Sequence, residues 1–168
     1  MNIRAIFATD KNHGIGQGAT MPWPKLSADL RHFSKLTRGH AVLMGSKTWH
    51  SDMPTPLPKR INIVMSNHII KENEVLSFSG TVDKNLLEKL QTALPKDCDL
   101  WIIGGANILK QWIPYCSEVW HTLIDGVWEC DTFFHAEEWQ CDFVPQTDSV
   151  QKISENGTNF TITNWKKK

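Results

Sequence analysis

Several features that would define a protein class at once are missing from this sequence. Its 168 residues include four cysteines, and these are widely spaced with no C-x-x-C pair. That spacing argues against a disulfide framework and against a cysteine zinc site, and free cysteines are typical of a reducing compartment. No long apolar signal segment stands at the N-terminus, and no apolar run approaches membrane-spanning length. We therefore expect a cytoplasmic protein.

An excess of either charge is also missing. Lys and Arg together number 18, and so do Asp and Glu. Balanced charge argues against a broad nucleic-acid interface and against an anionic membrane as a partner. The basic run at 166–168 is interpreted as a solvated tail.

Motifs of several common chemistries are missing as well. The sequence has no G-x-S-x-G elbow, no Walker A loop and no H-x-x-x-H spacing. His135, Ala136 and Glu137 match the H-x-E of zinc deaminases, but the P-C-x-x-C partner is absent. The sequence therefore predicts no metal site.

What is present predicts an α/β fold. A chain of this length suits one domain with a substantial core. Short apolar runs predict strands at 3–8, 41–44, 61–65, 75–78, 100–103 and 119–124, and helical patterns lie between them at 26–36, 82–94 and 107–113. This alternation predicts a mostly parallel sheet with helices on both faces. Two further strands, 141–144 and 160–165, are expected to form an antiparallel pair around the Asn156-Gly157 turn.

One acid, Asp29, has an unusual place in these patterns. It lies three residues after Leu26, so it points with the apolar stripe of its predicted helix. Its charged form then needs a partner that donates hydrogen bonds. Two interpretations stay open from spacing alone. Either a ligand supplies the donors, or Asp29 is an ordinary acid in the first turn of a helix that Ser27 caps.

Glycine and small polar residues follow the predicted strands. The glycine loop (residues 14–20) follows the first, residues 45–48 the second, Ser66-Asn67 the third, and Gly104-Gly105 a later one. Ligands of such sheets bind beyond the carboxyl ends of the strands, and helix N-termini attract phosphate. Together these segments predict a long phosphorylated ligand beside Asp29. Each segment alone is also compatible with a flexible loop or an ordinary capped helix.

Several longer motifs occur in an order typical of one family. They are G-I-G followed by M-P-W, L-x-A-D-L-x-x-F, V-L-M-G-x-K-T-W, P-L-P-x-R-x-N-I-V, I-I-G-G, and H-T-L-I-D followed by D-T-F-F. In them the chain resembles dihydrofolate reductase over nearly its whole length. The resemblance implies one domain over residues 1–168, with a central eight-stranded, mostly parallel sheet, an antiparallel C-terminal strand and about four flanking helices. It also implies NADPH-dependent reduction of 7,8-dihydrofolate to tetrahydrofolate, by hydride transfer to pterin C6 with protonation at N5.

The resemblance also implies roles for individual residues. Asp29 matches the family's active-site acid, which holds the 2-amino group and N3 of the pterin, while Trp23 would order a water and Thr122 would share the hydrogen bonds of Asp29. Arg60, which by itself is either solvated or a carboxylate clamp, would hold the glutamate α-carboxylate. The other residues placed against the substrate are Ile6, Ala8, Leu30, Phe33, Met53, Leu57 and Ile103. The residues placed against the cofactor are Ala8, Gly14, Ile15, Gly16, Gln17, Gly18, Ala19, Thr20, Gly45, Ser46, Lys47, Thr48, Ser66, Asn67, Gly104, Gly105, Ala106, Asn107, Ile108 and Leu109.

Two further features come with this resemblance. The glycine loop would cover the nicotinamide, and Asp131 would hold that loop from a neighbouring segment. The Gly104-Gly105 peptide would be cis.

The sequence departs from the family's pattern at several positions. Leu109 stands where the family usually has a Tyr beside the nicotinamide, and Thr55 where an Arg is often seen near the glutamate tail. Ser46 replaces a basic residue that commonly meets the 2′-phosphate of NADPH. His68 and Lys71 are the candidates to take over that contact.

Two other functions stay open. A related reductase of another pterin or of an aminopyrimidine, as in riboflavin synthesis, would keep the cofactor site without needing Arg60 or Leu57. A non-catalytic nucleotide-binding protein is the second, since a fold does not set a function; Asp29, Trp23 and Arg60 argue against it. We expect a monomer that binds NADPH, dihydrofolate and competing antifolates, with neither nucleic acid nor membrane as a partner.

Overall fold

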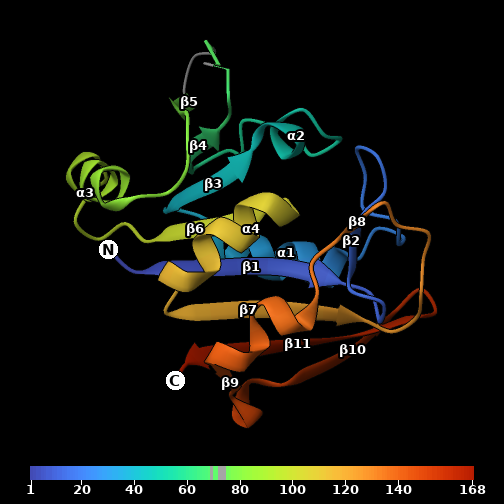
Figure 1. Ribbon diagram of the computed structural model, residues 1–168. Coiled ribbons are helices and arrows are strands. Elements are labelled where there is room, and N and C mark those ends of the chain that lie inside the picture. Colours follow the sequence, from blue (N-terminus) through green and yellow to red (C-terminus); the bar gives the residue numbers. More distant parts are fainter. Residues whose placement is uncertain (69, 72–74) are drawn as a thin grey trace.

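A twisted central sheet runs through the protein, as Figure 1 shows for the computed structural model, which describes residues 1–68, 70–71 and 75–168. Its main strands are β1 (Ile3–Thr9), β3 (Ala41–Gly45), β4 (Ile61–Met65), β5 (Val75–Phe78), β6 (Leu100–Gly104), β7 (Glu118–Ile124), β10 (Gln151–Glu155) and β11 (Thr158–Lys167). They lie in the order β10-β11-β7-β1-β6-β3-β4-β5. The six strands from β7 to β5 are parallel, and β11 is antiparallel to β7. The predicted fold class is confirmed, and the short β9 (Phe143–Pro145) adds a ninth strand by pairing with β11.

The C-terminal hairpin differs from the prediction in one strand. Asn156 and Gly157 do form the turn, both with positive φ, but the partner of β11 is β10, not 141–144. The segment 141–144 is divided between the 3₁₀ turn η3 (Gln140–Asp142) and β9. Hydrophobic periodicity did not predict strand β10, because Ile153 is its one apolar residue. Its pairing with β11, rather than burial, makes it a strand.

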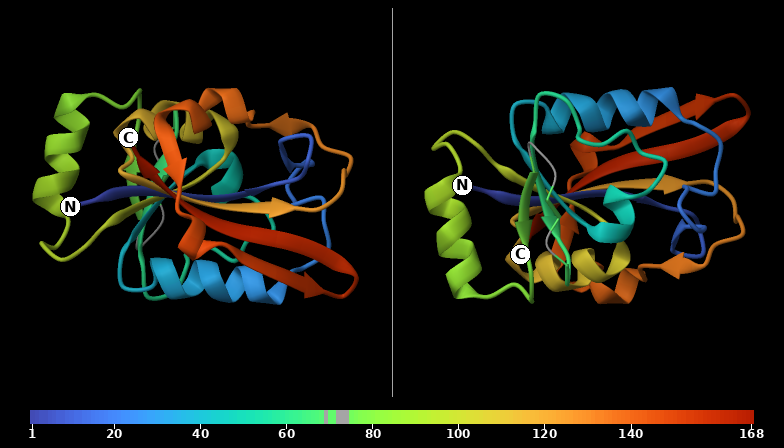
Figure 2. Two further views of the ribbon diagram at one scale, coloured as in Figure 1. Left: turned by 90° about the horizontal axis from the view of Figure 1, so that it is seen from below. Right: turned by 90° about the horizontal axis from the view of Figure 1, so that it is seen from above.

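In the described part of the chain, four α-helices accompany the sheet. They are α1 (Ser27–Thr37), α2 (Ser46–Trp49), α3 (Lys84–Ala93) and α4 (Ala106–Trp112). Figure 2 shows α1 on one side of the sheet and α4 on the other, as the alternating sequence pattern predicted. The predicted helix at 82–94 begins at an Asp83 cap, whose carboxylate accepts a hydrogen bond from the Leu86 N–H. Shorter 3₁₀ turns complete the chain: η1 (Ile113–Tyr115), η2 (Ala136–Glu138) and η4 (Thr147–Ser149).

Two of the three buried apolar clusters receive side chains from opposite faces of β3, because side chains alternate across each strand. In β3, Leu43 points to the core that contains Leu90 of α3 and Trp112 of α4, whereas Met44 points to the core against which Phe33 of α1 packs. Leu43 and Met44 have no exposed surface. Both faces of the sheet are thus covered by helices, which leaves the carboxyl ends of the parallel strands as the place for a ligand.

Among the helices in the described part of the chain, none is both long and apolar enough to cross a membrane.

Candidate active site

Asp29 lies in the first turn of α1, against the end of β7. The Thr122 hydroxyl on β7 donates a 2.6 Å hydrogen bond to its carboxylate. Burial raises the pKa of Asp29; the Thr122 bond lowers it, and the nearby negative charge of Glu155 raises it. Of the residues that the structure describes, no lysine, arginine or histidine forms an ion pair with Asp29. The carboxylate therefore has room for further donors, as the ligand interpretation requires.

The N-terminus of α1 is capped from a distant part of the chain. The Glu155 carboxylate, at the end of β10, accepts hydrogen bonds from the Ser27 N–H at 2.5 Å and the Ala28 N–H at 2.9 Å. These N–H groups hold the pKa of Glu155 below its usual range. The interpretation in which Ser27 caps the helix is not supported, because Ser27 is itself the first helical residue, although Asp29 does lie in the first turn. Any acceptor that reaches the orphan N–H groups can cap a helix, and here the C-terminal hairpin supplies it.

Apolar residues predicted for the substrate site gather on one face of the sheet. Ile6 and Leu57 are buried in the cluster that contains Trp49. Three more of the predicted residues, Phe33, Met53 and Ile103, are partly buried against that cluster. Trp23 and Ala8 belong to the neighbouring cluster, in which Trp23 packs edge-on against Trp128. Leu30 follows Asp29 in α1 and is half-buried.

Arg60 is held in place by the C-terminal half of α1. Its Nε donates to the Thr37 hydroxyl at 3.0 Å and its Nη2 to the Ser34 hydroxyl at 3.1 Å, while Nη1 donates to the Pro58 carbonyl at 2.8 Å. Its guanidinium also lies 5.7 Å from the centre of the Phe33 ring. No acid in the described part of the chain pairs with it. The guanidinium is thus a positive charge held against α1, the helix that carries Asp29, with donors left for a carboxylate.

Two glycine turns predicted for the cofactor lie next to each other. Gly104-Gly105, which ends β6, has the predicted cis peptide, and a Cβ added to Gly105 would lie 3.7 Å from the Thr48 hydroxyl. A Cβ on Gly45 would lie 3.0 Å from Cγ1 of Ile108, so a side chain there would require Ile108 to move by a few tenths of an ångström. No side chain caps the N-termini of α2 and α4. Their free N–H groups can donate to a phosphate.

Residues predicted for the two ends of the cofactor lie in different surroundings. Ser66 follows β4, the neighbour of β3, and its hydroxyl accepts a hydrogen bond from the His68 N–H at 3.1 Å. Asn67, His68 and Lys71 are exposed beside it. Leu109 is different, because it has no exposed surface and packs in the core with Trp112. Its side chain therefore belongs to the core rather than to the surface of the predicted site.

The glycine loop is anchored by acids. Its first residues form β2 (Gly14–Gly16), which pairs with β8 (Thr132–Phe133). The Asp131 carboxylate accepts a 2.8 Å hydrogen bond from the Gly18 N–H, and the Asp131 N–H donates to the Gly16 carbonyl at 2.9 Å. The bond from Gly18 holds the pKa of Asp131 below its usual range. The structure thus brings Asp131 to the glycine loop, where the resemblance placed it.

Asp10 is a second anchor, which sequence reasoning missed. It is fully buried, and its carboxylate accepts hydrogen bonds from the N–H groups of Asn12, Gly14 and Trp128. A Cβ added to Gly14 would lie 2.2 Å from the Cys130 sulfur, so residue 14 must be glycine for these two segments to meet. The sequence did contain a signal for this contact. An aspartate just before a turn that contains glycine often accepts hydrogen bonds from the backbone N–H groups of that turn.

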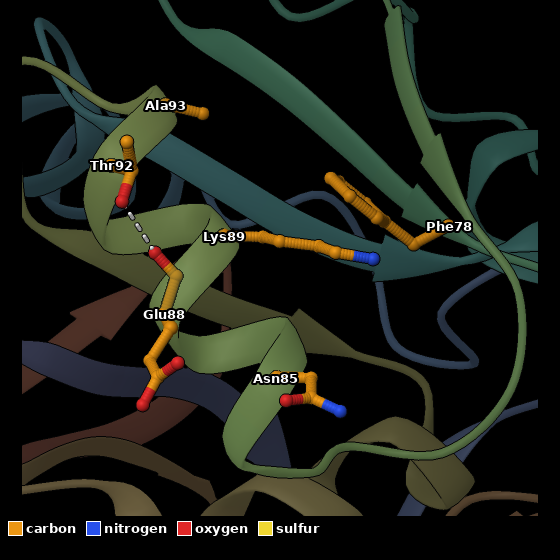
Figure 3. A pocket seen from close by; sticks show the side chains of 6 residues that line it. All are labelled: Phe78, Asn85, Glu88, Lys89, Thr92 and Ala93. Carbon is orange, nitrogen blue, oxygen red and sulfur yellow. Dashed lines mark hydrogen bonds between the residues drawn. The ribbon is translucent and has the colours of Figure 1, made fainter.

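An open depression elsewhere on the molecule is separate from these residues. It lies between α3 and β5, and in Figure 3 Lys89 extends toward Phe78 while the Thr92 hydroxyl donates to the Glu88 carbonyl. Asn85 and Ala93 complete its lining. No residue predicted for the substrate or the cofactor lines it.

Fold and site together define the class of the protein: an α/β protein with a half-buried acid, a fixed arginine and glycine turns gathered where parallel sheets bind ligands. The family model described as dihydrofolate reductase matches residues 2–167. The chain belongs to the dihydrofolate reductase family.

Individual relatives agree with this assignment. The dihydrofolate reductase of Haemophilus influenzae is 35% identical over 158 residues, which cover 92% of this chain and 91% of that one. The bifunctional dihydrofolate reductase-thymidylate synthase of Paramecium tetraurelia is 35% identical over 157 residues, and the chain spans 32% of its length. The structure of the dihydrofolate reductase from Enterococcus faecalis complexed with NADP(H) and RAB-propyl has the same fold. Its TM-score is 0.84 at 24% identity, with 99% of this chain and 96% of that chain covered.

Proposed function

We propose that the chain catalyses the NADPH-dependent reduction of 7,8-dihydrofolate to tetrahydrofolate. The observation that carries this proposal is the environment of Asp29: a half-buried carboxylate whose described partner is a neutral hydroxyl, 2.6 Å away. A pterin offers a 2-amino group and an N3–H side by side, and this donor pair matches the two oxygens of a carboxylate. The pterin would thus supply the donors that a buried charged acid needs.

The substrate's other parts fit the surroundings of Asp29. Phe33 and Leu57 offer apolar surface for the ring system. Arg60 would hold the glutamate α-carboxylate, and its three hydrogen bonds to the protein fix the guanidinium in advance. A charge that is already positioned loses little conformational freedom on binding.

Two glycine turns form a suitable cradle for the diphosphate of NADPH. The fit rests on the uncapped N-termini of α2 and α4, whose N–H groups have no side-chain partner. Lys47 in α2 would add positive charge, and Ser66 and Asn67 would contact the adenosine side. Because Ser46 is not basic, recognition of the 2′-phosphate would fall to His68 and Lys71. NADPH supplies the hydride when it is bound.

The chain's own side chains would then orient and shield the reacting groups. Asp29 would hold the pterin in one orientation, and its negative charge would favour the protonated form of the ring. Trp23 and the glycine loop would exclude bulk water, while one ordered water beside Trp23 would bring the proton for N5. Holding the reacting carbons about 3–3.5 Å apart in a dry pocket is the protein's main contribution.

One assay separates this proposal from its rivals. NADPH oxidation is followed by absorbance with dihydrofolate, and we expect oxidation that needs both compounds. A diaminopyrimidine antifolate should inhibit it competitively, because with one ring nitrogen protonated it presents an equivalent donor pair to Asp29. Oxidation with a riboflavin-type aminopyrimidine but not with dihydrofolate would instead indicate the related reductase. NADPH binding without turnover of either substrate would indicate a nucleotide-binding protein.

Substituting Arg60 tests the orientation of the substrate. Arg60→Leu should raise the KM for dihydrofolate by roughly 10–100-fold, since hydrogen bonds to a charged group contribute about 1.5–3 kcal/mol. The KM for a dihydropterin without the glutamate tail should stay the same. An equal rise in KM for both substrates would show that Arg60 does not bind the glutamate tail.

A further inference from the structure

Three potential metal ligands meet at the start of the glycine loop, outside the site described above. His13, His135 and Glu137 each place one ligand atom so that all three lie within 4.8 Å of one another. The centres of the two imidazole rings are 5.4 Å apart. Sequence spacing did not indicate this group, because residue 13 is distant from 135 and 137 along the chain.

Pairing of β2 with β8 brings the three residues together. His13 directly precedes β2, and His135 comes two residues after β8. The Phe134 N–H donates to the His13 carbonyl at 2.9 Å, and the His13 N–H donates to the Asp10 carbonyl at 3.1 Å. These two hydrogen bonds hold the backbone of His13 in place, and therefore the point from which its side chain extends.

The chemistry of this group suits a transition-metal cation. Two imidazoles and one carboxylate are a ligand set that Zn²⁺ accepts, with the fourth position left to water. Mg²⁺ and Ca²⁺ are poor candidates, because these ions prefer oxygen ligands to imidazole nitrogen. In a tetrahedral zinc site the ligand atoms are about 3.3 Å apart, given bonds of about 2.0–2.1 Å. Closing the present separation needs side-chain rotation, and the exposed side chains of His135 and Glu137 allow it.

Neighbouring charges leave the group free to bind a cation. Among the described residues, Lys110 is placed nearby by its 3.0 Å ion pair with Glu138, and the buried ring of His121 interacts electrostatically with His13. Glu138 also accepts a hydrogen bond from the His135 N–H at 3.1 Å, which fixes the backbone of that histidine. Glu137 makes no hydrogen bond or ion pair with another residue in the described part of the chain. The ring of His135 accepts a hydrogen bond from the Glu138 N–H, so a metal would compete with that bond for the ring.

We propose that His13, His135 and Glu137 bind one divalent transition-metal cation of the Zn²⁺ class, and that the bound cation cross-links the start of the glycine loop to the segment after β8. The dihydrofolate reaction uses no such cation, so this site is an addition to the proposed function. The cation restrains the glycine loop beyond the two-stranded pairing of β2 with β8.

Calorimetric titration of the chelator-treated full chain with Zn²⁺ alone tests the site. We expect one saturable event per chain, and at least about tenfold weaker binding in His13→Asn and in His135→Gln. Asparagine suits residue 13 because the φ of His13 is 64°, a conformation that asparagine tolerates. Glu137→Gln is the variant least able to disturb folding, and it should also weaken binding. His50→Gln, which removes an exposed histidine outside the group, should bind as the unmodified chain does.

Two further readouts separate a site from adventitious binding and test the cross-link. Saturating Zn²⁺ should raise the Tm of the unmodified chain and of His50→Gln, but not that of His13→Asn. It should also slow hydrogen exchange of the amides of residues 14–20. Equal Zn²⁺ affinity in the unmodified chain and in all three ligand variants would overturn the site. Binding without slower exchange would overturn the cross-link. None of these measurements uses folate or nicotinamide, so their failure and that of the proposed function are distinguishable.

Discussion

Asp29 and Asp131 are both aspartates of the candidate site, yet the protein shifts their acidities in opposite directions. Asp29 is half-buried, and its described hydrogen bond comes from a single hydroxyl, so the loss of solvation outweighs that bond and raises its pKa. Asp131 is exposed, and the Gly18 N–H and the Thr132 hydroxyl donate to its carboxylate, so its pKa falls. The difference separates two uses of the same side chain. An acid whose oxygens already accept backbone N–H groups holds the fold, and an acid that lacks such donors is available to a ligand.

Asp10 extends this comparison. It is more deeply buried than either of the other two, yet three backbone N–H groups donate to its carboxylate. Burial alone is therefore not what distinguishes Asp29. The distinguishing feature is burial with few donors, because only such an acid gains greatly from a ligand that supplies them.

The strongest test of the comparison is Asp29→Asn. The amide is nearly isosteric but carries no charge and has one acceptor instead of two. We expect kcat at neutral pH to fall by about 10²–10⁴-fold, with partial recovery at lower pH, where the substrate is more readily protonated. Steady-state kinetics across the pH range measure both effects. Normal turnover at neutral pH would contradict the role of Asp29.

The same variant tests the burial of the charge. Because the folded-state pKa of Asp29 is raised, the folded protein holds its proton more tightly than the unfolded chain does. Stability contributed by this group is therefore present below the unfolded value of 3.8 and declines as the pH rises above it. The Tm of Asp29→Asn should not show that decline. The Tm of the variant should therefore increase relative to that of the unmodified chain as the pH rises. Parallel curves would mean that Asp29 is not buried as a charge.

Removing the hydroxyl partner of Asp29 should have the next largest effect. Thr122→Val keeps the shape of the side chain but leaves a buried acceptor unsatisfied, which costs about 1–3 kcal/mol of stability. Since the Thr122 bond lowers the pKa of Asp29, the acid limb of the pH–rate profile should move to higher pH. Thr122→Ser, which retains the hydroxyl, is the matched control. Should both variants behave alike, the hydroxyl would have no role in the site.

Asp131→Asn should affect the glycine loop and leave the substrate side unchanged. Loss of the charged acceptor weakens the bond from the Gly18 N–H, and hydrogen exchange at residues 14–20 should become faster. We expect the KM for NADPH to rise a few-fold while the KM for dihydrofolate stays the same. A larger rise in the KM for dihydrofolate than in the KM for NADPH would mean that Asp131 acts on the substrate and not only on the glycine loop.

The smallest effect is expected for Glu155→Gln. An amide oxygen can still accept one hydrogen bond from the N-terminus of α1, so Tm should fall only slightly. Because the Glu155 charge raises the pKa of Asp29, its removal should move the acid limb of the pH–rate profile to lower pH, opposite to Thr122→Val. Lys152→Gln, an exposed substitution on the same strand, is the control and should leave the profile unchanged. If Glu155→Gln left the pH–rate profile unchanged, Glu155 would cap α1 without influencing the pKa of Asp29.

Most of the sheet could be predicted because its strands are buried on both faces. Runs such as Ala41–Gly45 and Leu100–Gly104 are almost wholly apolar, and such runs between helical patterns are typical of parallel sheets. The apolar stripe of α1 likewise placed Asp29 toward the protein rather than toward water. Prediction failed at the edge strand β10, whose residues are mostly polar and exposed.

The sequence by itself determined the buried strands and most of the helices, the family, and the candidacy of Asp29, because burial of apolar residues leaves a periodic pattern along the chain. Only the tertiary structure decided the polar partnerships: Glu155 on the N-terminus of α1, Asp10 with the 128–130 segment, and His13 beside His135. Each of these contacts joins residues more than a hundred positions apart. Such a pair depends on where the strands come to lie in the sheet, and nothing in the local pattern of either residue records that.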